Sequence, residues 1–238
     1  MDAFIKYIKR SLRELKSFWV RKIIKKQLKD DFVANDFGFN RGSPVDRFYI
    51  DKFFTENSNL VMGKCLEFGD TSYIVKYGKR VSKKVTFNYC DVSSMADDKL
   101  LGDISNIDSL PSGLFDCILC VNVLNFIYDT PSALLGLKKL LSRSGRIMLT
   151  VAGPSAHISR YDMDRWGDYW RMTDKALIKL AHDAGFHVEK SETFGNPYSC
   201  SAQLNGLSVE DLIEEKINPT HPDYQLLIAV VLSKREKD

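Results

Sequence analysis

An apolar run, MGKCLEFGD at residues 62–70, is the sequence feature that most constrains the fold of this chain. It indicates a buried strand that ends at Phe68 and breaks into a tight loop at Gly69 and Asp70. In open α/β sheets, ligands bind at the carboxyl ends of such strands. The run alone is a weak signal, because it lacks the fuller glycine-rich loop that lets backbone amides approach a ligand closely.

The pattern of an apolar run followed by an acid occurs twice more. The β-rich run VTFNYC leads to Asp91, 22 residues beyond Gly69, where a carboxylate can accept both hydrogen bonds of a ribose diol. A third short run, in KLLGDIS, precedes Asp103, whose carboxylate can accept from an adenine amino group. Each acid alone would be interpreted as a solvated turn residue. Acids after three successive strands favour a nucleotide-like ligand instead.

The next segment continues the alternation of strands and helices. FDCILCV (115–121) is continuously apolar, as a strand covered on both faces should be, and Asn122 follows at its carboxyl end. A helix is expected over about 131–141, then a turn at 144–145, and then a fifth strand in RIMLTVA.

The remainder completes the sheet. A helix capped by Thr173 is expected over 173–184, a sixth strand in GFHVEKSETFG and a last strand in YQLLIAVVLSK. The long insertion between these strands, 196–223, holds a predicted short helix near 208–215, and such insertions often shape a substrate pocket. We therefore predict a Rossmann-like α/β fold, with a seven-stranded, mostly parallel sheet that ends in an antiparallel hairpin.

A polar segment lies just ahead of the first strand. Ser43 and Pro44 can serve as N-cap and first residue of a helix over about 44–58. Asp46 and Arg47 give the start of this helix an unusual polar density. Two interpretations stay open: an ion-paired helix that only covers the sheet, or a segment that closes over a ligand.

The amino-terminal segment carries most of the positive charge. Residues 1–29 hold ten Lys or Arg and two acids, whereas residues 30–238 hold five more acids than bases. Apolar residues recur there at steps of mostly three or four, which predicts an amphipathic helix within 1–36, ahead of one α/β domain over 37–238. Its apolar stripe can pack on the domain or on a second copy in a homodimer, lie on an anionic membrane surface, or bind another macromolecule.

Composition bounds the compartment and the partners. No apolar run approaches the roughly 20 residues that span a bilayer, and basic residues at 6–13 interrupt any signal-peptide core. We therefore expect a cytoplasmic protein that the basic helix can hold at the inner membrane face. The acidic balance of the domain disfavours nucleic acid as its substrate. Cys117 and Cys120 should face opposite sides of a strand, and no cluster predicts a metal site.

Taken together, these motifs resemble those of class I S-adenosylmethionine-dependent methyltransferases. The narrower resemblance is to the bacterial type 11 methyltransferase-domain proteins associated with glycosyltransferases and surface-polysaccharide synthesis. It covers residues from about 37 to 234. The matching motifs are FGFNRGSPVDRFYIDKF, KCLEFGD with YIVKYG, FDCILCVNVLNFIYD, ISRYDMDRWGDYWRMT, FGNPYSCSAQLNGLSVEDL and DYQLLIAV.

The resemblance implies S-adenosylmethionine as cofactor and assigns its binding residues. Glu67, Phe68, Gly69 and Asp70 would border the methionine portion, Asp91 the ribose, Asp103 the adenine, and Asn122 the approach to the methyl group.

Two departures from the family pattern matter. Asp70, Thr71 and Ser72 stand where the class has glycines, and such side chains restrict the approach of backbone to a ligand. Asp91 lies about two residues further along the chain than the family pattern places the ribose-binding acid, so Asn88 is an alternative ribose contact. A catalytically degenerate protein that keeps the fold for binding, recruited to a membrane or partner enzyme, therefore stays open beside the enzyme.

The richest chemistry lies after the fifth strand, in HISRYDMDRWGDYWRMT (157–173). His157 is the preferred base for a hydroxyl acceptor, because its ordinary pKa near 6.5 suits proton removal, and Asp162 or Asp164 is the alternative. Aromatic faces suit the C–H face of a sugar, and charged groups suit its hydroxyls or an attached anion. The expected acceptor-binding residues are Arg165, Trp166, Tyr169, Trp170 and Arg171.

A structural interpretation competes with this one. Trp166, Tyr169 and Trp170 can instead cover the edge of the sheet as a satellite core, with Arg165 and Asp168 paired. The function that the sequence favours is methylation of a sugar or glycan, at a hydroxyl or an amine, in surface-polysaccharide synthesis.

Overall fold

A seven-stranded sheet forms the centre of the protein, and its strands run in the order β3-β2-β1-β4-β5-β7-β6. The computed structural model describes residues 15, 33, 36–89 and 98–235. The predicted helix within 1–36 and the predicted site residue Asp91 lie outside these residues. The strands are β1 (Met62–Phe68), β2 (Arg80–Asn88), β3 (Asp98–Leu101), β4 (Phe115–Val121), β5 (Leu141–Ala152), β6 (Phe186–Phe194) and β7 (Leu227–Lys234).

The strand directions confirm the predicted sheet. β1 pairs in parallel with β2 and β4, and the β2–β3 and β4–β5 pairs are parallel as well. β7 lies between β5 and β6 and is antiparallel to both. Because an antiparallel neighbour needs no crossover helix, the chain can return from β6 to β7 through the insertion alone.

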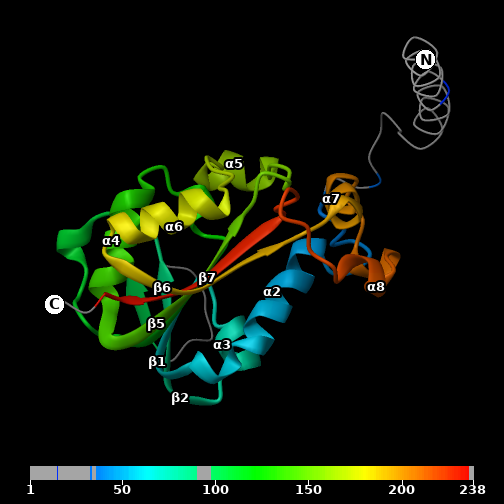
Figure 1. Cartoon of the computed structure of the whole chain (residues 1–238). Coiled ribbons are helices and arrows are strands. Elements are labelled where there is room, and N and C mark those ends of the chain that lie inside the picture. The colour runs from blue at the N-terminus through cyan, green and yellow to red at the C-terminus, as the bar shows by residue number, and fades with distance from the viewer. Residues whose placement is uncertain (1–14, 16–32, 34–35, 90–97, 236–238) are drawn as a thin grey trace, which may run out of the picture.

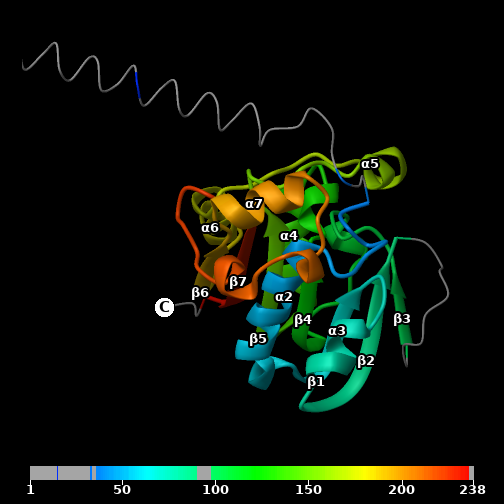
Figure 2. The ribbon, with the colours of Figure 1, turned by 90° about the vertical axis from the view of Figure 1, so that its right-hand side faces the viewer.

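Helices cover both faces of the sheet (Figure 1). α4 (Thr130–Leu140) and α6 (Asp174–Asp183) pack on one face; α2 (Val45–Glu56), α3 (Ser72–Tyr77) and α7 (Pro197–Leu204) pack on the other. Figure 2 shows α2 and α3 lying along β1 and β4. An apolar core lies between the sheet and the helices on each face. Cys120 belongs to the core under α4 and α6, and Cys117 belongs to the core under α2, α3 and α7, which confirms that the two cysteines face opposite sides of β4.

Some helix ends follow the sequence signals and others do not. The Thr173 hydroxyl accepts from the amide of Ala176 at 3.2 Å and caps α6 as predicted. At α2 the prediction was wrong by one residue, because Pro44 is the N-cap and Ser43 lies outside the helix. The reason is a long-range contact: Pro44 forms a β-bridge with Ser208, and the Ser43 carbonyl accepts from Val209 at 2.8 Å.

Two further expectations need correction. The turn expected at 144–145 is part of β5, which begins directly after α4 and shifts register there against β4. The insertion contains α7, which sequence analysis missed, although the side chain of Asn196 accepts from the amides of Tyr198 and Ser199 and Pro197 opens the helix. The helix expected near 208–215 is split into a 3₁₀ turn, Val209–Asp211, and α8 (Glu214–Ile217).

Within the described part of the chain, no helix is long and apolar enough to cross a membrane. Nor do three or more His, Cys, Asp or Glu side chains in that part gather where they could hold a metal ion.

Candidate functional site

The loop after β1 leaves an open space beside its glycine. Gly69 has φ +85°, a conformation that favours glycine, and a Cβ built on it would meet no atom of the described residues within 4 Å. The Gly69 amide donates to the Phe87 carbonyl at 3.1 Å, which ties the loop to the end of β2. Asp70 turns its carboxylate back to the amide of Ser72 at 2.8 Å. The backbone of this loop is therefore accessible to a ligand even though the loop contains one glycine.

Glu67 directs its carboxylate at the first turn of α3. Its two oxygens accept from the amides of Tyr73 at 3.1 Å and Ile74 at 2.8 Å, so they satisfy two otherwise unpaired donors at the helix start. Burial raises the pKa of Glu67 to about 7, and the two amide hydrogen bonds oppose that rise. Phe68 packs against Phe87, with ring centroids 5.0 Å apart. Glu67 and Phe68 were both expected beside the cofactor; in the structure Glu67 holds the turn between β1 and α3, and Phe68 packs between β1 and β2.

An unpaired donor lies at the carboxyl end of β2. Asn88 is buried, and its side-chain Nδ2 has no hydrogen-bond partner among the residues that the structure describes. A buried amide without a partner is costly, so the atom is suited to a ligand. Asp103, the acid expected at the adenine, lies exposed after β3 and accepts from the Ser105 amide at 2.8 Å.

Asn122 is held in a left-handed conformation at the end of β4. Its φ is +53°, which asparagine tolerates better than most residues. Its amide donates to the Thr150 carbonyl at 3.0 Å, and the Thr150 hydroxyl donates to its Oδ1 at 3.1 Å. Its Nδ2 donates to the carboxylate of Asp46 at 3.2 Å. β5 on one side and α2 on the other thus fix this side chain.

A pocket of about 230 Å³ opens beside Asn122, at the carboxyl ends of β4 and β5. We call it the carboxyl-edge pocket. The start of α2, the segments 37–44 and 156–171, and Gln203 of α7 enclose it. Its lining residues used below are Phe37, Asp46, Asn122, His157, Asp162 and Gln203.

Asp46 supplies a partly buried carboxyl group to this pocket. Burial raises its pKa above the ordinary value, and the neighbouring Arg47 guanidinium opposes that rise. Arg47 is turned to the hydroxyl of Tyr73, to which its Nη1 donates at 2.7 Å. The polar density noted at the start of this helix thus faces the site, as the second of the two sequence interpretations requires.

His157 lies in the pocket with its ring stacked on Phe37, the centroids 4.1 Å apart. Burial and the nearby Arg171 lower its pKa below the ordinary value, so the imidazole is neutral at pH 7. Within the described part of the chain, its Nδ1 is buried without a hydrogen-bond partner, and so is Oε1 of Gln203 in the same pocket. These two atoms are free to pair with a polar ligand.

Arg171 holds the loop that carries His157. Its guanidinium forms a two-point ion pair with Asp168, at 2.6 and 2.7 Å, and donates to the carbonyls of Ala156 and His157. Arg171 lines the pocket, but its donors are engaged within the protein. The alternative pairing of Asp168 with Arg165 was wrong: Arg165 lies over the ring of Tyr161, 3.4 Å from its centroid.

The structure separates the other predicted residues. Asp162 lines the carboxyl-edge pocket. Asp164 is exposed, and its Oδ1 lies 3.8 Å from Nη1 of Arg160. Trp166, on α5 (Arg160–Trp166), is half exposed. Tyr169 and Trp170 pack on Tyr128 at the molecular surface, outside the pocket lining.

Sequence analysis missed two buried amides near the site. Asn125 accepts from the Ala152 amide at 3.2 Å through Oδ1, and its carbonyl accepts from Tyr169, so it joins the end of β5 to the loop after α5. A polar side chain inside the apolar run VLNFI could have indicated from the sequence that Asn125 is buried and hydrogen-bonded. Gln203 belongs to the helix that the sequence did not predict, so nothing indicated that it would reach the pocket.

Comparisons with known proteins agree with this architecture. No protein-family model and no curated protein matches the chain. Among solved structures, the N-methyltransferase NodS from Bradyrhizobium japonicum WM9, in complex with S-adenosyl-L-homocysteine, matches with a TM-score of 0.52 and 14% identity, over 85% of this chain and 94% of that chain. A methyltransferase from Thermotoga maritima matches with a TM-score of 0.50 and 18% identity, over 80% and 92%.

The [4+2]-cyclase SpnF also matches, with a TM-score of 0.54 and 12% identity, over 87% of both chains. An N-methyltransferase and a [4+2]-cyclase thus share this architecture, so the likeness identifies the fold and leaves the reaction open. This chain has the Rossmann-like fold of the class I methyltransferases.

Proposed function

We propose that the protein is an S-adenosylmethionine-dependent methyltransferase that acts on a hydroxyl or amine of a small polar acceptor. The observation that carries this proposal is the carboxyl-edge pocket, in which His157 Nδ1 and Gln203 Oε1 are buried beside the fixed Asn122 and have no partner among the described residues. A pocket that contains such polar atoms is suited to a polar ligand. Its place, at the strand ends where open α/β sheets bind ligands, supports the same role.

The residues at the neighbouring strand ends fit the cofactor. The open face of Gly69 leaves room beside the loop after β1, and Asn88 offers a free amide where β2 ends. Asp103 lies after β3 at the same edge of the sheet. We assign the methionine portion to 67–70, the ribose to Asn88 and Asp91, and the adenine to Asp103. When bound, S-adenosylmethionine supplies an electrophilic methyl group on a positively charged sulfur.

The pocket residues would position the acceptor and remove its proton. The neutral imidazole of His157 would take the proton from an acceptor hydroxyl during methyl transfer, or from an acceptor ammonium beforehand, because an ammonium nitrogen has no free electron pair with which to accept the methyl group. Gln203 accepts a hydrogen bond from the acceptor, and Asp46 with Asn122 holds the polar wall against which it lies. Asp162 is the alternative base inside the pocket, and Asp164 is a more distant one.

A sugar is our preferred acceptor. Phe37 and Phe39 give the pocket aromatic faces beside its polar atoms, a mixture that suits a sugar ring. Trp166, Tyr169 and Trp170, with Arg165, extend this surface outward, where further sugar units of a glycan could lie. A surface-polysaccharide precursor would then reach a cytoplasmic enzyme that residues 1–29 hold at the inner membrane face.

A second function, binding without catalysis, is favoured by one observation. Glu67 is engaged by the amides of α3, and Asp70 to Ser72 replace the glycines that would bring backbone close to the cofactor. A protein of this kind could bind the donor or its product and recruit a partner. It would show no methyl transfer.

The test is calorimetric titration with S-adenosylmethionine and S-adenosylhomocysteine, followed by radiolabelled methyl transfer to sugars, lipid-linked glycans and amines. Binding of both nucleosides together with labelling of a sugar class supports the enzyme. Binding without labelling of any acceptor supports the second function. Failure to bind either compound would overturn both.

A further inference from the structure

A second pocket lies at the strand ends opposite those that form the carboxyl-edge pocket, and its lining is strongly basic. It measures about 1180 Å³ and opens where β5 and β6 begin and β7 ends, beside the end of α4. We call it the amino-edge pocket. Arg146, which lines it, precedes Ala152 by six residues on β5, so about 20 Å of strand separates it from the carboxyl-edge pocket. Whatever binds here does not take part in the proposed methyl transfer directly.

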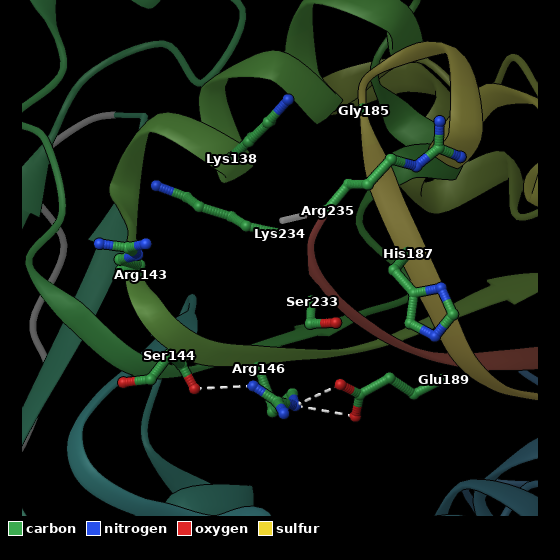
Figure 3. A pocket seen from close by; sticks show the side chains of 10 residues that line it. All are labelled: Lys138, Arg143, Ser144, Arg146, Gly185, His187, Glu189, Ser233, Lys234 and Arg235. Carbon is green, nitrogen blue, oxygen red and sulfur yellow. Dashed lines mark hydrogen bonds and ion pairs between the residues drawn. The ribbon is translucent and has the colours of Figure 1, made fainter. Parts of the chain in front are cut away.

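The positive charges of this pocket are largely uncompensated. Arg146 is paired, because its Nε donates to Glu189 at 2.7 Å. Lys138, Arg143, Lys234 and Arg235 have no carboxylate within ion-pairing distance among the described residues. Figure 3 shows Lys138, Arg143 and Lys234 on one side of the pocket and Arg235 on the other, above the Arg146–Glu189 pair. Four cations around one hollow, without a carboxylate partner among residues 36–89 and 98–235, form a site of strong positive potential.

The fold maintains this arrangement despite its electrostatic cost. Lys138 donates to the carbonyl of Ala184 at 2.9 Å, which fixes its ammonium at the pocket wall. Gly185 makes room for it, since a Cβ at that position would collide with Nζ of Lys138. Burial, and then the charge of Lys138, lower the pKa of Lys234. An anion between the two ammonium groups would relieve this repulsion.

The shape and chemistry of the lining select among anions. Among the described residues that line the pocket, the only ring on which a nucleobase could stack is the imidazole of His187, which disfavours single-stranded nucleic acid. No large apolar side chain is present to insert into a bilayer. Arginine and lysine together with the hydroxyls of Ser144 and Ser233 are donors that suit phosphate oxygens. Several cations spread around a concave site suit several phosphates on one ligand.

We propose that the amino-edge pocket binds a compact ligand that carries two or more phosphate groups, with Arg143 and Lys234 as its principal contacts. Neither side chain has a hydrogen bond or ion pair within the described structure, so both are free to turn to the ligand. The site is independent of the methyl-transfer chemistry proposed above.

The test is calorimetric titration of the full-length protein with tripolyphosphate at low ionic strength, and with ATP to learn whether a nucleoside is accepted. We expect saturable binding that weakens as salt rises. Arg143→Ala and Lys234→Ala should each weaken it about 10- to 100-fold, because each removes a charge-assisted contact. The matched control is Lys175→Ala, which removes one positive charge as well. Lys175 is exposed at the start of α6, whereas the pocket lies beyond the end of that helix.

Thermal unfolding without ligand shows whether the variants fold. Because the side chains of Arg143 and Lys234 make no hydrogen bond or ion pair with the described residues, both variants should unfold near the wild-type temperature. Absence of tripolyphosphate binding in the wild type, or equal weakening by Lys175→Ala, would overturn the site. A third outcome is that the wild type does not bind tripolyphosphate but binds phosphatidylserine vesicles, and that Arg143→Ala loses the vesicle binding. This outcome would overturn the compact ligand and show that the pocket binds an anionic membrane surface.

Discussion

The side-chain amide of Asn122 donates to the carboxylate of Asp46, Nδ2 to Oδ2 at 3.2 Å, and so joins the end of β4 to the first turn of α2. This contact closes the carboxyl-edge pocket beside the place assigned to the methyl group. It brings together two residues that are 76 positions apart in the chain. Their pairing makes Asp46 a candidate for positioning the acceptor.

Replacing Asp46 with asparagine should separate function from stability. Burial raises the Asp46 pKa, so the native state disfavours its charged form, and a neutral side chain of the same shape removes that cost. We expect Asp46→Asn to unfold at or above the wild-type temperature at pH 7 and to turn over about 10- to 100-fold more slowly. Calorimetry should show unchanged binding of the methyl donor. A marked loss of stability would show that the charge itself holds α2 in place.

The cofactor assignment predicts the behaviour of three variants. Asn88→Ala, Asp91→Ala and Asp103→Ala should each weaken donor binding by about 1–3 kcal/mol, roughly 5- to 150-fold, because each loses a hydrogen bond to the donor. Asp108→Ala, which removes an exposed acid in the 3₁₀ turn after Asp103, serves as control. If the Asp91 variant binds normally and the Asn88 variant does not, the ribose contact belongs to Asn88 alone.

Removal of the imidazole at 157 should affect turnover and leave donor binding intact. His157→Ala is expected to lower turnover by about 10²–10⁴. The base must be neutral, and its pKa is lowered, so wild-type turnover should rise with pH through a midpoint below 6.5 and then level off. His182→Ala, on the exposed side of α6, should retain this profile. An unchanged profile in His157→Ala would transfer the role to Asp162 or Asp164.

The basic amino-terminal segment gives a separate prediction. If residues 1–29 lie on an anionic membrane, vesicle binding should require acidic lipid and fade with salt, because each cation near the surface contributes about 1 kcal/mol that salt screens. A variant without these residues should lose vesicle binding and still bind the methyl donor. Aggregation of that variant, or conversion of a dimer to a monomer, would instead identify the apolar stripe as a packing surface.

The strands were predictable because they depend on local apolar runs. Continuous apolar sequence predicted β4 and β7, and the residues placed at strand ends, such as Asn122, lie there in the structure. β5 was predicted to start too late, because Leu141 is followed by the mostly polar stretch 142–146, of which only the last residue, Arg146, pairs with β4, whereas Leu141 itself pairs with Phe115. Local sequence therefore identified the sheet, while pairing between strands determined where β5 begins.

The site was less predictable because its walls come from distant segments. His157 was singled out for its residue type and place, but its contact with Phe37 and the exposed position of Trp166 depend on tertiary packing. Gln203 reaches the pocket from α7, a helix whose cap at Asn196 is also held by the carbonyls of Lys216 and Pro219. No periodicity within one segment encodes such contacts.

Glu67 should make stability depend on pH. Its folded pKa is about 7 against an ordinary value of 4.5, so between these values the native state binds a proton that the unfolded state does not. Stability should therefore fall as pH rises from about 4.5 to 7, by about 3 kcal/mol from this group. Glu67→Gln cannot titrate, so the difference between the unfolding free energies of the two proteins should change across this window and be constant above it. A constant difference throughout would mean that the amides of Tyr73 and Ile74 hold the carboxylate charged, with a pKa near its ordinary value.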